Sequence, residues 1–400
     1  MKFFSDRQRI YLDYAAATPV RKEVLRAMKP FWSKVYGNPG AIHKEGVLAK
    51  AAVEEARELV ARTLRVRATD VIFTSGGTES NNLAIRGAVR AMRLANVPVT
   101  DIEVISTTVE HPSVIECLKL LALEGVRVVY APIDNEGRVI VEEFKKLLSH
   151  RTRLVTIAYA NSETGVIQDI NRLSRTVRLF EKENGLTIPF HTDAAQAPRW
   201  LSCALDSLGV DMLSLDAGKC EGPKGIGILI KRPRVQLASI NGGGSQESKL
   251  RPGTEPVPLV VGAATALSLA QKECEKLSVR SAALRDRWIK ELSKIQGVVL
   301  NGSAEHRLPN NVNISIPGFD TEFAVVSLDT ADIAASTKSA CAGAGSGRSH
   351  VIYAMTADEA RAASTIRFTL TPQTSRRDLK KTTEALRKHM ERMHQSGLTA

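Results

Sequence analysis

Two lysines stand close together in the stretch LDAGKCEGPKG, residues 215–225, among small residues that offer little side chain to pack. A lysine amine can attack a carbonyl carbon, so Lys219 or Lys224 is a candidate for covalent chemistry. The same stretch could equally be a glycine-rich turn between two strands, with no chemical role. The stretch by itself leaves both interpretations open.

Other unusual residues follow four more short apolar runs. SGGTESNN (75–82) follows the first, and Gly76, Gly77 and Thr78 there suggest a tight turn at the start of a helix, where phosphate groups bind. A capped helix after a glycine turn is also common without any ligand. The other three runs end at EHPSV, NSETG and HTDAAQA, which contain His111, Asn161, Asp193 and Gln196. Asp193 could instead be a helix N-cap, and a lone histidine is more often structural.

Taken together, these positions supply what pyridoxal phosphate needs. A lysine forms a Schiff base with its aldehyde, and an acid pairs with its pyridine nitrogen so that the ring withdraws electrons. The histidine would cover the ring, the amides would approach its phenolic oxygen, and the glycine turn would hold the phosphate. The GxGxxG pattern of a nicotinamide-binding fold is absent. The sequence therefore predicts a pyridoxal phosphate site.

The elements that must position these residues are visible in the pattern of apolar runs. From about residue 70 to 235, near-continuous apolar strands alternate with helical patterns, which is typical of a mostly parallel sheet covered on both faces. A long helical stretch follows, and strands then alternate with helices to the end. We predict an α/β protein with a large mostly parallel-sheet domain over residues 17–258. A smaller α+β C-terminal domain is predicted over 259–400, with residues 1–16 packing near it.

Composition excludes several classes of protein. The chain is 43% hydrophobic and 24% charged, without an apolar run long enough to cross a membrane and without a signal-peptide pattern in MKFFSDRQRIYLDY. We therefore expect a cytoplasmic protein that does not bind membranes. The five cysteines show no disulfide or metal-ligand spacing, and the histidines form no metal motif, so we expect free thiols and no metal site.

The formal net charge of +12 could indicate nucleic acid, an acidic partner or an anionic cofactor. Much of it lies in residues 375–395, which read as an amphipathic helix with a solvated basic face. No nucleic-acid-binding motif accompanies this segment, so we do not expect a nucleic-acid partner.

Ten motifs, in order along nearly the whole chain, resemble those of the class V aminotransferases of fold type I, and among them the cysteine desulfurases of the NifS/IscS kind. They are IYLDYAAATPV, YGNPGAIH, SGGTESNN, EHPSV, NSETGVIQDI, FHTDAAQA, GPKGIGIL, LRPGTEPVPLVVG, KSACAGAG and STIRFTL. The resemblance implies a pyridoxal-phosphate-dependent enzyme of fold type I that acts on L-cysteine.

The resemblance also implies roles for individual residues. Lys219 would hold the cofactor covalently, so Lys224 supports only the turn. The cofactor-binding set would be Gly77, Thr78, His111, Asn161, Asp193, Gln196, Lys219 and Thr254, with Thr254 reaching the other subunit's cofactor in a homodimer. Asn38, Asn161 and Arg367 would lie near the substrate, Arg367 binding its carboxylate. Lys219, Cys341 and His111 would be catalytic.

The chain departs from the family beside the active lysine. Where the family has Ser-x-His-Lys, this chain has Asp216, Ala217, Gly218 and Lys219, and Ala17 replaces a threonine of the opening motif. The family's serine and histidine help to hold the phosphate, whereas an ionised Asp216 close to it would be repulsive. We expect the carboxylate to avoid the phosphate, either by pointing away and bonding to backbone or a cation, or because the phosphate is held differently.

Cys341 is the predicted sulfur acceptor. It lies in STKSACAGAGSGRSH, whose glycines and small residues favour a mobile loop over a packed helix. Such a loop could carry a thiolate to the sulfur of a bound cysteine. Cys220, next to Lys219, is the one rival.

The predicted function is therefore a cysteine desulfurase. It would convert L-cysteine to L-alanine and a Cys341 persulfide, which passes to a protein acceptor such as an iron–sulfur scaffold. A class V aminotransferase or a selenocysteine lyase is the nearest alternative. A non-catalytic protein that keeps the fold is a third possibility, which the altered residues 216–219 permit.

Overall fold

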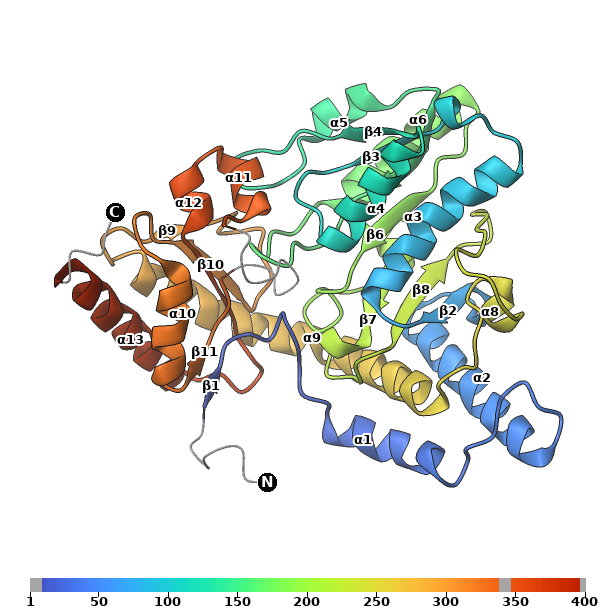
Figure 1. Ribbon diagram of the computed structural model, residues 1–400, viewed down its shortest axis with the longest axis horizontal. Coiled ribbons are helices and arrows are strands. Elements are labelled where there is room, and N and C mark those ends of the chain that lie inside the picture. The colour runs from blue at the N-terminus through green and yellow to red at the C-terminus, as the bar shows by residue number, and fades with distance from the viewer. Residues whose placement is uncertain (1–8, 338–346, 396–400) are drawn as a thin grey trace.

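The computed structural model describes residues 9–337 and 347–395. The larger sheet in this part of the chain has the strand order β2-β8-β7-β6-β5-β3-β4 (Figure 1). In that order the strands are Val71–Thr74, Gly227–Lys231, Met212–Asp216, Phe190–Asp193, Thr152–Thr156, Glu103–Ser106 and Arg127–Tyr130. β8 runs antiparallel to β2 and β7, and the remaining pairs are parallel. The carboxyl ends of all strands except β8 therefore meet at one edge, as the sequence predicts for a mostly parallel sheet.

Helices cover both faces of this sheet because alternate strand residues point to opposite sides. On β2, Ile72 packs in the core beneath α3 (Gly77–Leu94) and α4 (Pro112–Leu123), whereas Phe73 packs in the opposite core. That second core is covered by α2 (Lys44–Leu64), α6 (Ile170–Asn184) and the first half of α9 (Val257–Leu292). Shorter helices complete this part: α1 (Lys22–Met28), α5 (Val141–Leu147), α7 (Leu205–Leu208) and α8 (Gln246–Lys249).

The C-terminal part is built on an antiparallel sheet. Its strands have the order β12 (Thr365–Thr369), β10 (Asn311–Ser315) and β9 (Val299–Leu300) among the described residues. The helices are α10 (Thr321–Thr330), α11 (His350–Thr356), α12 (Glu359–Ala363) and α13 (Arg376–Gln395). The N-terminal strand β1 (Ile10–Tyr11) pairs with β11 (Ile333–Ala334), and Asp13 then bridges to Thr369, so Ile10–Asp13 lie in this part.

The helix α9 joins the two parts. It is 36 residues long, and Figure 1 shows it running from beneath the larger sheet to the C-terminal part. Val260 and Leu267 belong to the core of the larger sheet, whereas Trp288 and Leu292 belong to the core of the smaller one. Because one helix contributes to both cores, the division near residue 258 stays a prediction.

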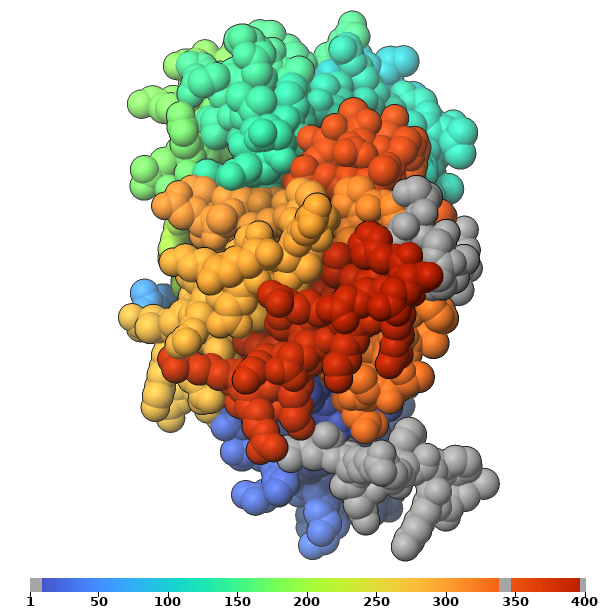
Figure 2. All heavy atoms as spheres, turned by 90° about the vertical axis from the view of Figure 1, so that its left-hand side faces the viewer, coloured from blue at the N-terminus to red at the C-terminus, as the bar shows by residue number. Residues whose placement is uncertain are grey.

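The predicted basic face of the last helix is confirmed. Leu379, Leu386 and Met390 of α13 are buried, whereas the lysines and arginines between them are exposed. In the space-filling view of Figure 2, α13 lies on the surface beside the end of α9. Among the residues that the structure describes, no helix combines the length and the apolar character that a membrane crossing requires.

Candidate active site

One cavity lies at the carboxyl edge of the larger sheet, and most of the predicted site residues line it. These are Gly77, Thr78, His111, Asn161, Asp193, Gln196, Lys219 and Arg367. They come from five strand ends and from β12 of the smaller sheet, and only the fold brings them together. The cavity has two ends that we name after their aspartates. The Asp193 end comprises Asn81, His111, Ser113 and Asp193, and the Asp216 end comprises Gly76, Gly77, Thr78, Asp216 and Gly218.

Lys219 reaches this cavity from a short turn after β7. Its Nζ donates to the carbonyl oxygens of Ala15 at 3.0 Å and Ala16 at 2.6 Å. Lys224 is exposed, donates to the Thr18 carbonyl oxygen at 3.1 Å, and does not line the cavity. Lys219 therefore lines the cavity, whereas Lys224 does not, and the assignment of the covalent role to Lys219 stays a prediction.

The N-terminal segment that contains Ala15 and Ala16, whose carbonyl groups accept from Lys219, is held by a buried polar network. The Tyr14 hydroxyl donates to the Glu221 carboxylate, which also pairs with Arg199 at 2.9 Å. The Thr18 hydroxyl donates to the Gly218 carbonyl oxygen at 2.9 Å and accepts from the Glu221 N–H at 2.8 Å. Burial and the Glu221 carboxylate raise the pKa of Tyr14, so its hydroxyl keeps its proton. These bonds fix the carbonyl groups against which the Lys219 amine rests.

At the Asp193 end, the buried Asp193 carboxylate is oriented by two donors. Asn81 of α3 donates through Nδ2 to Asp193 Oδ2 at 2.7 Å, and the Ala195 N–H donates to Oδ1 at 2.9 Å. Asn81 Nδ2 also donates to the Ser113 hydroxyl at 2.9 Å, whereas its buried Oδ1 has no hydrogen-bond partner within the described residues. A carboxylate held in this way can accept a hydrogen bond from a ring nitrogen.

His111 caps the N-terminus of α4 with its own ring. Its Nδ1 accepts from the Ser113 N–H at 3.1 Å, which assigns the ring proton to Nε2. Glu110, the preceding residue, is buried and accepts from the Thr107 hydroxyl at 2.7 Å and the Ala158 N–H at 3.1 Å. Burial, with a smaller contribution from the charge of Asp193, raises the pKa of Glu110 to about 7. An ionisable group thus lies directly behind the histidine that lines the cavity.

The two predicted amides are held by backbone groups. Asn161 donates to the Val109 carbonyl oxygen at 2.7 Å, and its Oδ1 accepts from the N–H groups of Glu163 and Thr164, each at 2.8 Å. Gln196 donates to the same Ala15 carbonyl oxygen that Lys219 uses, at 3.1 Å. Both amides are therefore positioned before any ligand arrives.

The Asp216 end differs from the prediction in one respect. Asp216 does bond to backbone: Oδ1 accepts from the Gly218 N–H at 2.8 Å and Oδ2 from the Gly77 N–H at 3.2 Å. Gly77, however, is the first residue of α3, in the turn predicted to hold the phosphate. Of the two expected arrangements, the one in which the carboxylate points away from this turn is wrong, because the turn supplies one of its two donors. The other, in which the carboxylate avoids the phosphate because the phosphate is held differently, stays a prediction.

Arg367 of β12 lines the cavity and is almost fully buried. Its Nη1 donates to the Ser162 carbonyl oxygen at 2.9 Å and its Nη2 to Asp13 Oδ1 at 2.8 Å. Its buried Nε has no hydrogen-bond partner among the residues that the structure describes. The guanidinium therefore keeps a donor for a further acceptor such as a carboxylate.

Two predicted residues do not line this cavity, and a third lies outside the described residues. Asn38 is exposed and accepts from the Gly40 N–H at 2.9 Å, and Thr254 is exposed in the segment before α9. Cys341 lies outside the described residues. Its rival Cys220 is buried, and burial raises the pKa of its thiol to about 12, so it is a poor nucleophile.

Sequence analysis did not single out Asn81, Ser113 or Asp13. Asn81 lies four residues after Gly77 on α3, so it shares a helix face with the predicted turn, and that spacing was an available signal. Asp13 and Arg367 are 354 residues apart, and no local pattern connects them.

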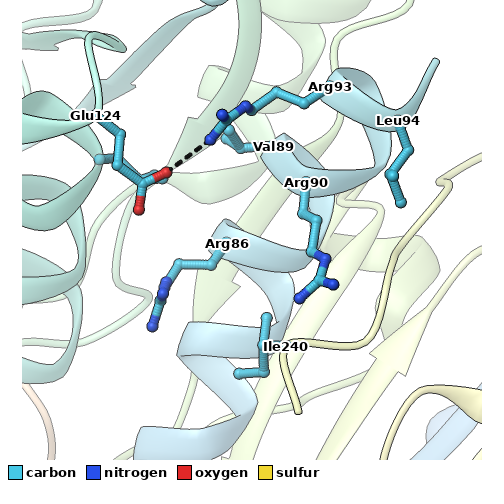
Figure 3. Close-up of a pocket in the computed structure, with 8 residues that line it drawn as sticks. Arg86, Val89, Arg90, Arg93, Leu94, Glu124 and Ile240 are labelled. Carbon is cyan, nitrogen blue, oxygen red and sulfur yellow. Dashed lines mark hydrogen bonds and ion pairs between the residues drawn. The ribbon is translucent and has the colours of Figure 1, made fainter. Parts of the chain in front are cut away.

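A second cavity lies between the C-terminal half of α3 and α4. Figure 3 shows Arg86, Arg90 and Arg93 of α3 around it, with Arg93 paired to Glu124 at 2.9 Å. None of the predicted site residues lines this cavity, which is therefore separate from the candidate active site.

Comparison with known proteins places this geometry in context. The model of the aminotransferase class-V family matches residues 10–382. The cysteine desulfurase IscS of Dictyoglomus turgidum is 40% identical over 388 residues, which cover 97% of this chain and 96% of the relative. Cysteine desulfurase IscS 1 of Archaeoglobus fulgidus is 37% identical, with 96% and 97% covered. A solved structure described as a NifS-like protein superposes with a TM-score of 0.87 at 33% identity, covering 96% of this chain and all of that one.

Proposed function

The chain belongs to the aminotransferase class-V family, and from that premise we propose that it is a pyridoxal-phosphate-dependent L-cysteine desulfurase. The observation that carries the proposal is the meeting of Lys219 with the Asp193–Asn81 pair in one cavity. A nucleophilic amine and an oriented carboxylate are the two groups that this cofactor requires from a protein. The family matches also confirm the resemblance drawn from the ten motifs.

The residues of the Asp193 end fit the cofactor ring. Lys219 would bind the aldehyde, Asp193 would accept from the pyridine nitrogen, and His111 would cover one face of the ring. Asn161 and Gln196 would approach the phenolic oxygen. The unpartnered Asn81 Oδ1 supports this fit, since a buried amide oxygen without a donor indicates a ligand or water in the native site. When bound, pyridoxal phosphate withdraws electrons from the amino acid carbon and so eases cleavage of its bonds.

The substrate would be held from the opposite side. Arg367 would bind the carboxylate of cysteine, with its Nε as the additional donor, while Asp13 and Ser162 fix the guanidinium plane. The segment that contains Asn38 would lie near the bound substrate. The thiolate of Cys341 would attack the sulfur of the bound cysteine. A sulfur–sulfur bond forms as the carbon–sulfur bond breaks, and the carbon takes up a proton to leave alanine.

The proposal extends to partners. Thr254 is exposed and does not line the cavity of its own chain, which is consistent with a homodimer in which it contacts the partner's cofactor phosphate. The Cys341 persulfide would pass to a protein acceptor such as an iron–sulfur scaffold, in the cytoplasm. An aminotransferase or a selenocysteine lyase remains the alternative, because the same cavity would serve either reaction.

The decisive experiment measures sulfide and alanine released from cysteine by the purified protein with pyridoxal phosphate and a reductant. We expect equal amounts of both products from the wild type, none from Lys219→Ala, and near-normal amounts from the matched variant Lys224→Ala. Borohydride should fix the cofactor on Lys219. Keto-acid-dependent transamination without sulfide would favour the aminotransferase, and label on Lys224 would contradict the assignment of Lys219.

A second pair of variants tests the sulfur acceptor. Cys341→Ser should still bind cofactor and cysteine but release no sulfide, whereas Cys220→Ser should behave as the wild type because Cys220 is buried with a raised thiol pKa. The reverse result would transfer the role to Cys220.

A further inference from the structure

We propose that Asp216 determines the cofactor preference of this chain. Its carboxylate takes the place that a phosphate would occupy at the N-terminus of α3, so the phosphate of pyridoxal phosphate adds little to binding. Pyridoxal, which lacks the phosphate, should then bind almost as well. The inference rests on the proposed function, since it concerns the same cofactor, but it names a preference that the proposed function does not require.

The Asp216 carboxylate is held by two backbone donors. Its two oxygens accept from the N–H groups of Gly77 and Gly218, at 3.2 and 2.8 Å. Gly77 opens an 18-residue helix, whose N-terminus bears a partial positive charge. A carboxylate from the end of β7 is thus already bound at the anion-binding end of that helix.

The glycine turn is packed closely beside this carboxylate. Gly227 of β8 pairs with Asp216 of β7, and a Cβ at Gly227 would lie only 2.5 Å from the Gly76 carbonyl carbon. The turn therefore packs directly on the strand next to Asp216. Any phosphate that approached Gly77 would meet the carboxylate at short range.

The lack of a side chain at Gly218 helps to set the position of the Asp216 carboxylate. A Cβ at Gly218 would lie 3.2 Å from Asp216 Oδ1 and 3.4 Å from Lys224 Cγ. A larger residue would press on the carboxylate oxygen that the Gly218 N–H now holds. The absence of a side chain at Gly218 therefore leaves room for the Asp216 carboxylate. Gly218 has no side chain and an ionised Asp216 only accepts hydrogen bonds, so neither residue offers a side-chain donor to an anion.

Two consequences follow for a phosphate at this end. It must share or displace the carboxylate at the Gly77 N–H, and it lies beside a like charge that opposes its binding. The Asp193 end and Lys219 would face the ring and not the phosphate group, so they would bind the rings of pyridoxal and pyridoxal phosphate alike.

The test compares dissociation constants of pyridoxal phosphate and pyridoxal for the full-length protein freed of cofactor. Binding is followed by the absorbance that depends on Lys219. For the wild type we expect constants within about fivefold of each other, since charge repulsion cancels most of the phosphate contacts. Asp216→Asn keeps the shape and removes the charge. It should bind pyridoxal phosphate at least about tenfold more tightly and leave pyridoxal unchanged.

Matched variants complete the design. Asp216→Ser should show the same selective gain, so the test does not depend on the folding of one variant. Asp320→Asn makes the same change at the N-cap of α10, where Asp320 accepts from the Glu322 and Phe323 N–H groups, and should alter neither constant.

The outcomes separate the two proposals. Tighter pyridoxal phosphate binding by both Asp216 variants, with pyridoxal unchanged, supports the role of Asp216. If the wild type strongly prefers pyridoxal phosphate and the variants lose affinity for it, the inference is overturned while the proposed function stands. If no variant gives a Lys219-dependent absorbance with either aldehyde, the proposed function fails and the inference fails with it.

Discussion

The two ends of the candidate cavity each contain an aspartate at the end of a neighbouring parallel strand, yet the two carboxylates are bound differently. Asp193 accepts one bond from a side chain, Asn81, and one from backbone, and it faces the cavity. Asp216 accepts only backbone N–H groups, one of which belongs to the helix terminus predicted to bind an anion. At the Asp193 end the carboxylate is available to a ligand. At the Asp216 end the carboxylate is already bound to the N–H groups that could otherwise bind an anion.

Substitutions at the Asp193 end should therefore lower activity strongly, whereas substitutions at the Asp216 end should lower it little. The motifs at the first end match the family, whereas the second end combines the matching motif SGGTESNN with the departures Asp216 and Gly218 beside Lys219. Four predictions would break or sharpen this contrast.

The largest effect is expected at Asp193. Asp193→Ala should lower kcat for cysteine by roughly 10³-fold, because a preorganised charge at the ring is lost from a water-poor site. Cofactor should still attach to Lys219, which absorbance will show. A variant with kcat near that of the wild type would contradict the role of Asp193.

Glu110→Gln should change how stability depends on pH. The folded protein retains the Glu110 proton up to about pH 7, whereas an ordinary glutamate in the unfolded chain releases it near 4.5. The wild-type free energy of unfolding should therefore fall by a few kcal/mol between these pH values and stay level above them. Urea unfolding at several pH values should show that Glu110→Gln lacks this fall. An identical pH dependence in both proteins would show that Glu110 ionises normally.

Asn81→Ala should cost roughly tenfold in kcat, since it removes one hydrogen bond to a charged carboxylate but leaves the carboxylate in place. The KM for cysteine should change little, because Asn81 bonds to Asp193 and Ser113, whereas Arg367 is held by Asp13 and Ser162. Asn82→Ala is the matched control: Asn82 donates to the Thr78 carbonyl oxygen and not to Asp193. Equal losses in both variants would mean that only the helix is disturbed.

The smallest effect is expected at the Asp216 end. Thr78→Ala should weaken pyridoxal phosphate binding only about threefold in the wild type, because the phosphate there is already poorly held. In an Asp216→Asn background the same change should cost more, since the phosphate can then approach the turn. Equal costs in the two backgrounds would contradict the coupling of Thr78 with Asp216.

Much of the fold could be predicted from the sequence. The apolar runs of β2, β3, β5, β6 and β7 are near-continuous because both faces of these strands are buried, so each run could be recognised although it is only four or five residues long. The edge strand β4 is partly exposed. The order of the strands was not readable. β8 lies antiparallel between β2 and β7, although more than 150 residues separate β2 from β8, because pairing depends on which edges the connecting helices leave open.

The candidate site divides in the same way. Residue types at strand ends made His111, Asp193 and the two lysines of residues 215–225 candidates, since the carboxyl ends of parallel strands meet at one edge. The choice of Lys219 over Lys224 came from the resemblance to the family. Tertiary structure alone decided that the Lys219 amine rests on the Ala15 and Ala16 carbonyl oxygens and that Arg367 pairs with Asp13. It also decided that Asp216 turns toward Gly77. A sequence specifies which groups are available, but a hydrogen bond forms where donor and acceptor come within about 3 Å, and over such separations only the packed chain sets that distance.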